Sequence, residues 1–84
     1  NVRHNVAFAD EGERAAMIAA IQTQAERADA ELDTTDGYRL DYGDALVLAR
    51  PSGTEPVVRV YAEARERDRA RELADEMVAA IEGA

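Results

Sequence analysis

One short segment of the sequence gathers residue types that could bind an anion. It spans residues 50–56 and reads RPSGTEP. A glycine can adopt positive φ, so the backbone N–H groups of Ser52, Gly53 and Thr54 could turn toward a single anion. The hydroxyls of Ser52 and Thr54 could add donors, and Arg50 could offer a two-pronged guanidinium. These types in this order predict a phosphate-binding loop.

The remaining residues of the segment and one arginine beyond it modify that prediction. Pro51 and Pro56 restrict the two ends of the loop, which lowers the entropy lost when a ligand orders it. Arg59 could supply a second positive charge or pair with a neighbouring acid. Glu55 would repel a phosphate unless it bonds elsewhere, so we expect it to support the loop. Proline, serine, glycine and threonine are also common in ordinary turns, and composition alone would favour a plain hairpin.

The composition excludes several other classes of site. The chain has 84 residues, no cysteine and one histidine, His4, so disulfides, thiolate ligands and a histidine-rich zinc site are excluded. There are 18 acidic residues against 10 basic ones, all ten of them arginine, for a net charge of −8. This balance argues against nucleic acid and anionic membranes as partners.

The same numbers bear on domain count and location. A chain this short predicts a single domain, residues 1–84. No apolar run approaches the roughly 20 residues of a membrane-spanning helix, and we expect a cytoplasmic protein. High acidity without lysine suggests a salt-rich cytoplasm, where charge repulsion is screened. The chain starts with Asn1, so we expect an excised piece or a processed product.

The elements that must position the loop follow from hydrophobic periodicity. Residues 2–9 alternate as a short strand, and Asp10 with Glu13 has the spacing of a capped helix start. Apolar residues then recur every three or four positions as far as Leu32, which predicts one helix, and residues 33–37 form a polar turn. Strands are predicted at 38–42, 45–49 and 57–64, and a second helix starts near Asp68.

The predicted order is therefore β-α-β-β-β-α. Three successive strands with short connections form an antiparallel meander, and two amphipathic helices can bury their apolar stripes only against a sheet face. We expect an α+β domain with a four-stranded antiparallel sheet packed on two helices. Residues 50–56 then connect two neighbouring strands.

The ordered string RPSGTEP followed by VVRVYAEA resembles the C-terminal domain of the α-D-phosphohexomutases, which include phosphoglucomutase, phosphomannomutase and phosphoglucosamine mutase. The resemblance covers essentially the whole chain and implies a TATA-binding-protein-like domain, the last of four. It implies that the loop binds the phosphate of a hexose phosphate through Arg50, Ser52, Gly53 and Thr54, with a further contact from Arg59. Pro51, Glu55 and Pro56 would support the loop.

The resemblance also implies what must lie in other domains of the same enzyme. The family moves phosphate between C1 and C6 of a hexose through a phosphoserine, a bisphosphorylated intermediate and Mg²⁺. Neither the phosphoserine motif nor the Asp-x-Asp-x-Asp metal loop occurs here. We therefore expect no catalytic residue, metal or cofactor in this domain, and no activity from it alone. Asp33 with Asp36, and Asp41 with Asp44, lack the metal-loop spacing and are interpreted as solvated turn carboxylates.

Two alternatives and a few isolated residues complete the interpretation. The chain could belong to a phosphoglucosamine mutase, or it could be a non-catalytic protein-interaction domain of the same fold. His4 is interpreted as a surface residue or an interdomain contact. The three tyrosines, Tyr38, Tyr42 and Tyr61, could stack on a sugar, but packing against the sheet is the simpler interpretation.

Overall fold

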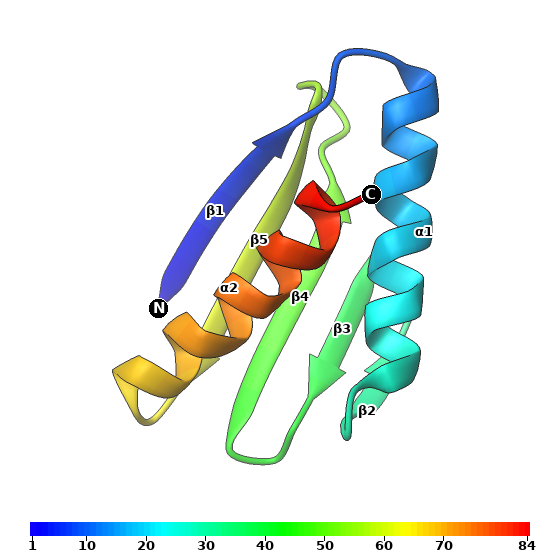
Figure 1. Cartoon of the computed structure of the whole chain (residues 1–84). Helices are drawn as coiled ribbons and strands as arrows, with labels where there is room; N and C mark the ends of the chain where they lie inside the picture. Colours follow the sequence, from blue (N-terminus) through cyan, green and yellow to red (C-terminus); the bar gives the residue numbers. More distant parts are fainter.

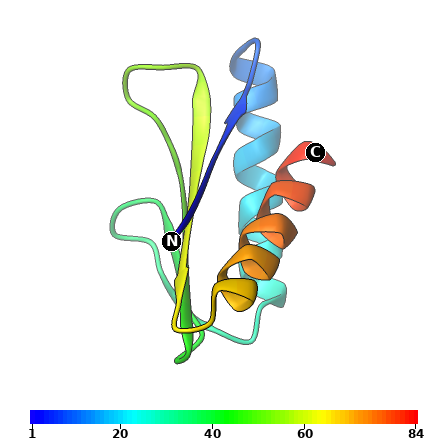
Figure 2. The ribbon, with the colours of Figure 1, turned by 90° about the vertical axis from the view of Figure 1, so that its left-hand side faces the viewer.

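A computed structural model describes all 84 residues. Five strands and two helices follow one another as β1 (Val2–Ala7), α1 (Glu11–Arg27), β2 (Glu31–Asp33), β3 (Tyr38–Asp41), β4 (Ala45–Pro51), β5 (Val57–Ala64) and α2 (Arg67–Glu82). The strands form one sheet in the order β1-β5-β4-β3-β2, and every neighbouring pair is antiparallel. Both helices lie on the same face of this sheet (Figures 1 and 2), so the α+β class is confirmed.

The sheet has five strands where the sequence predicted four. The first helix ends at Arg27, since Ala28 already has extended backbone angles (φ −71°, ψ 142°). Leu32, expected on the helical stripe, instead lies in β2 opposite Leu40 and is 43% exposed. A lone leucine between Glu31 and Asp33 fits a strand as well as a helix, because three residues cannot distinguish the two periods. A last helical turn with so few apolar residues would pack poorly against the sheet. Pairing with β3 instead gives the backbone groups of these residues hydrogen-bond partners.

The core lies between the helices and one face of the sheet. All 16 buried residues are apolar, and no polar side chain is buried. In β5 the expected alternation is confirmed, because Val58, Val60 and Ala62 are buried. Their counterparts in β4 are Ala45, Val47 and Ala49. Small residues at these positions let the helices lie close to the sheet.

The first helix starts as the sequence predicted. The Asp10 carboxylate accepts a hydrogen bond from the Glu13 N–H at 2.8 Å, and the Glu13 carboxylate accepts one from the Ala9 N–H at 3.0 Å. This pair is a variant of the capping box in which Glu13 bonds the amide one residue before the N-cap, so it satisfies one amide of the first helical turn and one amide of the preceding chain. It fixes where the chain turns from β1 into α1.

The opposite face of the sheet carries no helix (Figure 2). Side chains alternate along a strand, so the residues between the buried ones point to this open face. Arg50 of β4 and Arg59 of β5 are therefore both on the open face, and they lie directly opposite each other across the two strands. The strand pairing thus brings the two arginines of the predicted site together.

Candidate functional site: a loop and two arginines

The loop that connects β4 to β5 is held together by its own hydrogen bonds. The Ser52 N–H donates to the Val57 carbonyl at 2.9 Å, which closes the loop, and the Val57 N–H donates to the Glu55 carbonyl at 2.8 Å. The Ser52 hydroxyl oxygen accepts bonds from the N–H groups of Thr54 and Glu55, both at 3.2 Å. Ser52 therefore orders the loop, which extends beyond the sheet on the side away from the helices (Figure 2).

The expected arrangement of three inward-turned amides is not formed in this conformation. Gly53 does not have positive φ; only Gly37 and Gly43 do. The N–H groups of Ser52 and Thr54 are already bonded within the loop, whereas the Gly53 N–H has no partner. The Thr54 N–H is directed to the Ser52 hydroxyl, a local side-chain bond that competes with a ligand, and the Ser52 N–H closes the loop by donating to the Val57 carbonyl. The hydroxyl oxygens of Ser52 and Thr54 lie 3.5 Å apart, so one hydroxyl donates to the other. The donors open to a ligand are therefore the Gly53 N–H and the remaining hydroxyl, and the second hydroxyl becomes available if this bond breaks.

The two arginines beside the loop are each paired with a carboxylate. Arg50 Nη1 lies 3.0 Å from Asp36 Oδ2, and Arg59 Nη2 lies 2.6 Å from Glu55 Oε1. Arg59 also donates through Nη1 to Asn5 Oδ1 at 3.4 Å. Like charges directly opposite each other on neighbouring strands are unfavourable. Two flanking carboxylates offset that repulsion, and a bound phosphate could do the same.

A pocket of about 370 Å³ adjoins the loop on the open face of the sheet. The Arg3 guanidinium lies 5.4 Å from the centre of the Tyr61 ring at this pocket, and the Tyr61 hydroxyl donates to Glu63 at 3.0 Å. That hydrogen bond raises the pKa of Tyr61. Three strands, β1, β4 and β5, thus each contribute an arginine to the lining of this pocket. The pocket is lined by Arg3, His4, Asn5, Leu48, Arg50, Arg59, Val60 and Tyr61.

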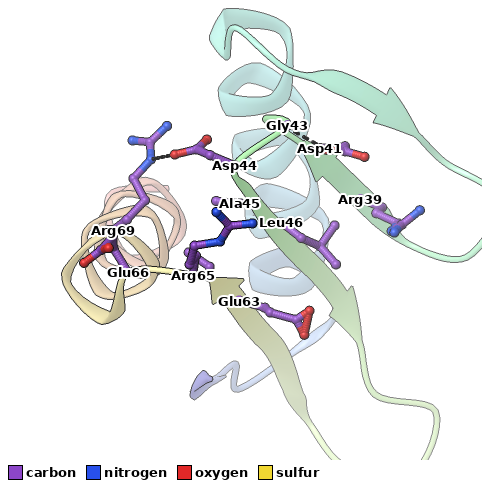
Figure 3. Close-up of a pocket in the computed structure, with 11 residues that line it drawn as sticks. Arg39, Asp41, Gly43, Asp44, Ala45, Leu46, Glu63, Arg65, Glu66 and Arg69 are labelled. Atoms are coloured by element: carbon purple, nitrogen blue, oxygen red, sulfur yellow. Dashed lines mark hydrogen bonds and ion pairs between the residues drawn. The ribbon is translucent and has the colours of Figure 1, made fainter.

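The largest hollow on the surface lies at the other end of the same strands. It has a volume of about 720 Å³ and is formed by the β3–β4 turn and the β5–α2 turn (Figure 3). Its three arginines, Arg39, Arg65 and Arg69, share the lining with four carboxylates, so it has no excess of positive charge. Arg69 donates to Asp44 at 3.1 Å, and this bond raises the pKa of Arg69. Size alone therefore does not identify an anion site here.

One residue that the sequence interpretation treated as a solvated turn carboxylate takes part in the site. Asp36 lies in the β2–β3 loop and bonds Arg50, 14 positions along the chain. The antiparallel register could have revealed this contact: Tyr38 lies opposite Ala49, so the residues just before Tyr38 must approach Arg50. The spacing of the two residues in the sequence alone does not indicate that Asp36 contacts Arg50.

The other residues singled out from the sequence lie apart from the loop or from one another. His4 Nε2 is 3.8 Å from Asp75 Oδ1 of α2, although the residue also contributes to the lining of the open-face pocket. Tyr38 and Tyr42 pack against the core, while Tyr61 faces the opposite side of the sheet. The three tyrosines therefore do not form one stacking surface.

No group of three or more histidine, cysteine, aspartate or glutamate side chains is arranged to hold a metal ion. Neither helix is both long enough and apolar enough to cross a membrane.

Comparison with known proteins places these features in a family. The family model described as phosphoglucomutase/phosphomannomutase, C-terminal domain, matches residues 4–80. A phosphoglucomutase/phosphomannomutase of Thermococcus kodakarensis is 44% identical over 62 residues, which is 74% of this chain and 14% of that protein. A probable phosphoglucosamine mutase of Methanopyrus kandleri is 45% identical over 62 residues, with the same coverage.

A third relative extends the match along nearly the whole chain. The phosphoglucosamine mutase of Mycolicibacterium paratuberculosis is 40% identical over 80 residues, 95% of this chain and 16% of that protein. The chain thus spans about a sixth or less of the length of these relatives. It belongs to the family of phosphoglucomutase/phosphomannomutase C-terminal domains.

Proposed function

We propose that this domain binds the phosphate group of a hexose phosphate within a larger phosphohexomutase. The observation that carries the proposal is the placement of Arg50 and Arg59 side by side on the open face, next to the loop. Two guanidiniums can bind phosphate oxygens with several parallel N–H donors. The hydroxyls of Ser52 and Thr54 and the Gly53 N–H supply the remaining donors, so the site suits a phosphate monoester.

Arg50 and Arg59 must be able to leave their carboxylates for this to work. Their side chains are 46% and 44% exposed, and the partner carboxylates are more exposed still. Exposed ion pairs are worth only about 0.2–1 kcal/mol, whereas a hydrogen bond to a charged group contributes about 1.5–3 kcal/mol. A phosphate dianion can therefore displace Asp36 and Glu55 or share the arginines with them.

The reaction itself belongs to the proposal for the complete protein. There, phosphate would move between C1 and C6 of the sugar through a phosphoserine and a bisphosphorylated intermediate, and residues outside these 84 would hold Mg²⁺. The present domain would bind substrate and leave the chemistry to the others. A TATA-binding-protein-like fold, a cytoplasmic location and a host with a salt-rich cytoplasm are further parts of the proposal. The acidic composition supports the last of these.

An NMR titration of the 84-residue chain with glucose 1-phosphate tests the binding role. We expect the amide signals of Gly53 and Thr54 and the side-chain signals of Arg50 and Arg59 to move with a Kd of about 1 mM, which corresponds to about 4 kcal/mol. Glucose should leave them unchanged, because it lacks the phosphate. Movement confined to the hollow around Asp44 and Arg69, or no movement at the loop at tens of millimolar ligand, would contradict the proposal.

A further inference from the structure

The β2–β3 loop lies against the backbone of Arg50. Gly37 has φ +79°, and a Cβ placed on it would come within 2.6 Å of Arg50 Cβ and 2.9 Å of the Ala49 carbonyl oxygen. Only glycine permits so close an approach at this φ. The contact fixes the distance between this loop and the start of the Arg50 side chain.

The same loop is ordered from within. The Asp33 carboxylate accepts a hydrogen bond from the Thr35 N–H at 2.8 Å, which forms a compact turn. Asp36 follows this turn and precedes Gly37, so its position is set from both sides. Its Oδ2 then meets Arg50 Nη1 at 3.0 Å.

The geometry of the Asp36–Arg50 pair allows Asp36 to orient the guanidinium without using all of its donors. Asp36 bonds one terminal nitrogen of the guanidinium, so Nε and Nη2 of Arg50 have no protein partner and can donate to a ligand. The Asp36 side chain is 74% exposed, which weakens its attraction for the arginine. The pair still restricts the Arg50 side chain before a ligand arrives, so less conformational entropy is lost when the ligand binds.

We propose that Asp36 is a positioning residue, which holds the guanidinium of Arg50 ready for a phosphate monoester. This inference rests on the phosphate-binding role proposed above. In this proposal the β2–β3 loop also belongs to the site, because it orients Arg50, whereas the RPSGTEP loop supplies the groups that contact the phosphate. Glu55 lies in the same loop as the ligand donors and pairs with Arg59, only four residues away. Asp36, in contrast, reaches its arginine from a different loop.

Two variants of Asp36 separate orientation from charge. Asp36→Asn keeps an oxygen that can accept from Arg50 and removes the charge, whereas Asp36→Ala removes both. With inorganic phosphate as the probe, we expect Asp36→Ala to weaken binding about 3- to 10-fold, and Asp36→Asn to stay within about 2-fold of the parent chain. In the ligand-free chain, ¹⁵N relaxation of Arg50 Nε should show greater motion in Asp36→Ala and parent-like motion in Asp36→Asn.

Asp44→Ala is the matched control, because it breaks an aspartate–arginine pair of similar length, 3.1 Å, at the far end of the strands. It removes the same charge and should leave phosphate affinity unchanged. The inference is overturned if both Asp36 variants bind phosphate more tightly, if both bind equally less tightly, or if neither differs from the parent. If phosphate does not bind the parent chain at Arg50, the proposed function fails and this inference fails with it. Unchanged Arg50 motion in Asp36→Ala overturns the inference alone.

Discussion

The two ends of the β4–β5 pair are built from similar parts. Each end has a nearby glycine with positive φ, Gly37 at the loop end and Gly43 at the hollow end. Each has a turn in which an aspartate accepts the N–H two residues further on, at 2.8 Å in both cases. Each also has an arginine paired with an aspartate, at 3.0 Å for Arg50 and 3.1 Å for Arg69.

The ends differ in what surrounds the arginine. At the loop end, Arg50 lies opposite a second arginine on an open sheet face, next to the hydroxyls of Ser52 and Thr54 and an unpaired Gly53 N–H. At the hollow end, four carboxylates compete for three guanidiniums, and Arg69 also lies 5.3 Å from the centre of the Tyr42 ring. An aspartate–arginine pair is therefore no sign of an anion site. The distinguishing feature of the loop end is a pocket whose lining contains three arginines and no carboxylate.

The largest expected difference between the two ends concerns their glycines. Gly37→Ala and Gly43→Ala both place a side chain at positive φ, which costs about 1–2 kcal/mol. Only at Gly37 does the new Cβ collide with backbone atoms; at Gly43 nothing lies within 4 Å. Overpacking adds about 1–3 kcal/mol, so we expect a loss of about 2–5 kcal/mol for Gly37→Ala and about 1–2 kcal/mol for Gly43→Ala. Urea unfolding measures both, and equal losses would show that the β2–β3 loop does not press on β4.

The second difference concerns ligand affinity. Arg50→Ala removes a charged donor from the proposed phosphate site, so we expect glucose 1-phosphate to bind about 10- to 100-fold more weakly, as follows from losing about 1.5–3 kcal/mol. Arg69→Ala removes an equally charged residue from the hollow and should leave the affinity unchanged. Isothermal titration or NMR titration gives the two Kd values. A similar loss in both variants would mean that net charge, not position, determines binding.

Much of this fold could be predicted because its elements follow simple periodicities. The alternation in residues 57–64 and the capping box at Asp10 are both present in the structure. The fifth strand was missed because the three residues Glu31–Asp33 are too few to show an alternating pattern, although they pair with β3 across a short loop. The α+β class did not depend on that strand, so it survived the error.

The site was predictable only in part, for a related reason. Residue types identified Arg50 and the loop as candidates, but the paths of hydrogen bonds depend on loop conformation. The Ser52 hydroxyl accepts the Thr54 N–H, which was expected to face a ligand, and Asp36 reaches Arg50 only because β3 lies beside β4. Residue types thus indicate which groups are able to bind an anion. Tertiary structure decides which of those groups are already occupied.

The smallest expected effect concerns the turn that carries Asp36 to Arg50. Hydrogen bonds from the Thr35 hydroxyl, and then from the Thr35 N–H, lower the pKa of Asp33. A carboxylate with a lowered folded-state pKa stabilises the fold above its unfolded pKa of about 3.9, and that contribution is lost as the pH falls through the folded value.

Thr35→Val removes the hydroxyl and keeps the N–H. We therefore expect the Asp33 carboxyl titration, followed by ¹³C NMR, to shift upward while remaining below the ordinary range for aspartate. An unchanged midpoint would mean that the backbone bond alone orders this turn. If the midpoint rises to the ordinary value and the Arg50 side chain also loosens, then Thr35 belongs to the chain of contacts that positions the arginine. The hollow end offers no equivalent, because the residue that donates to Asp41 there is Gly43, which has no side-chain hydroxyl.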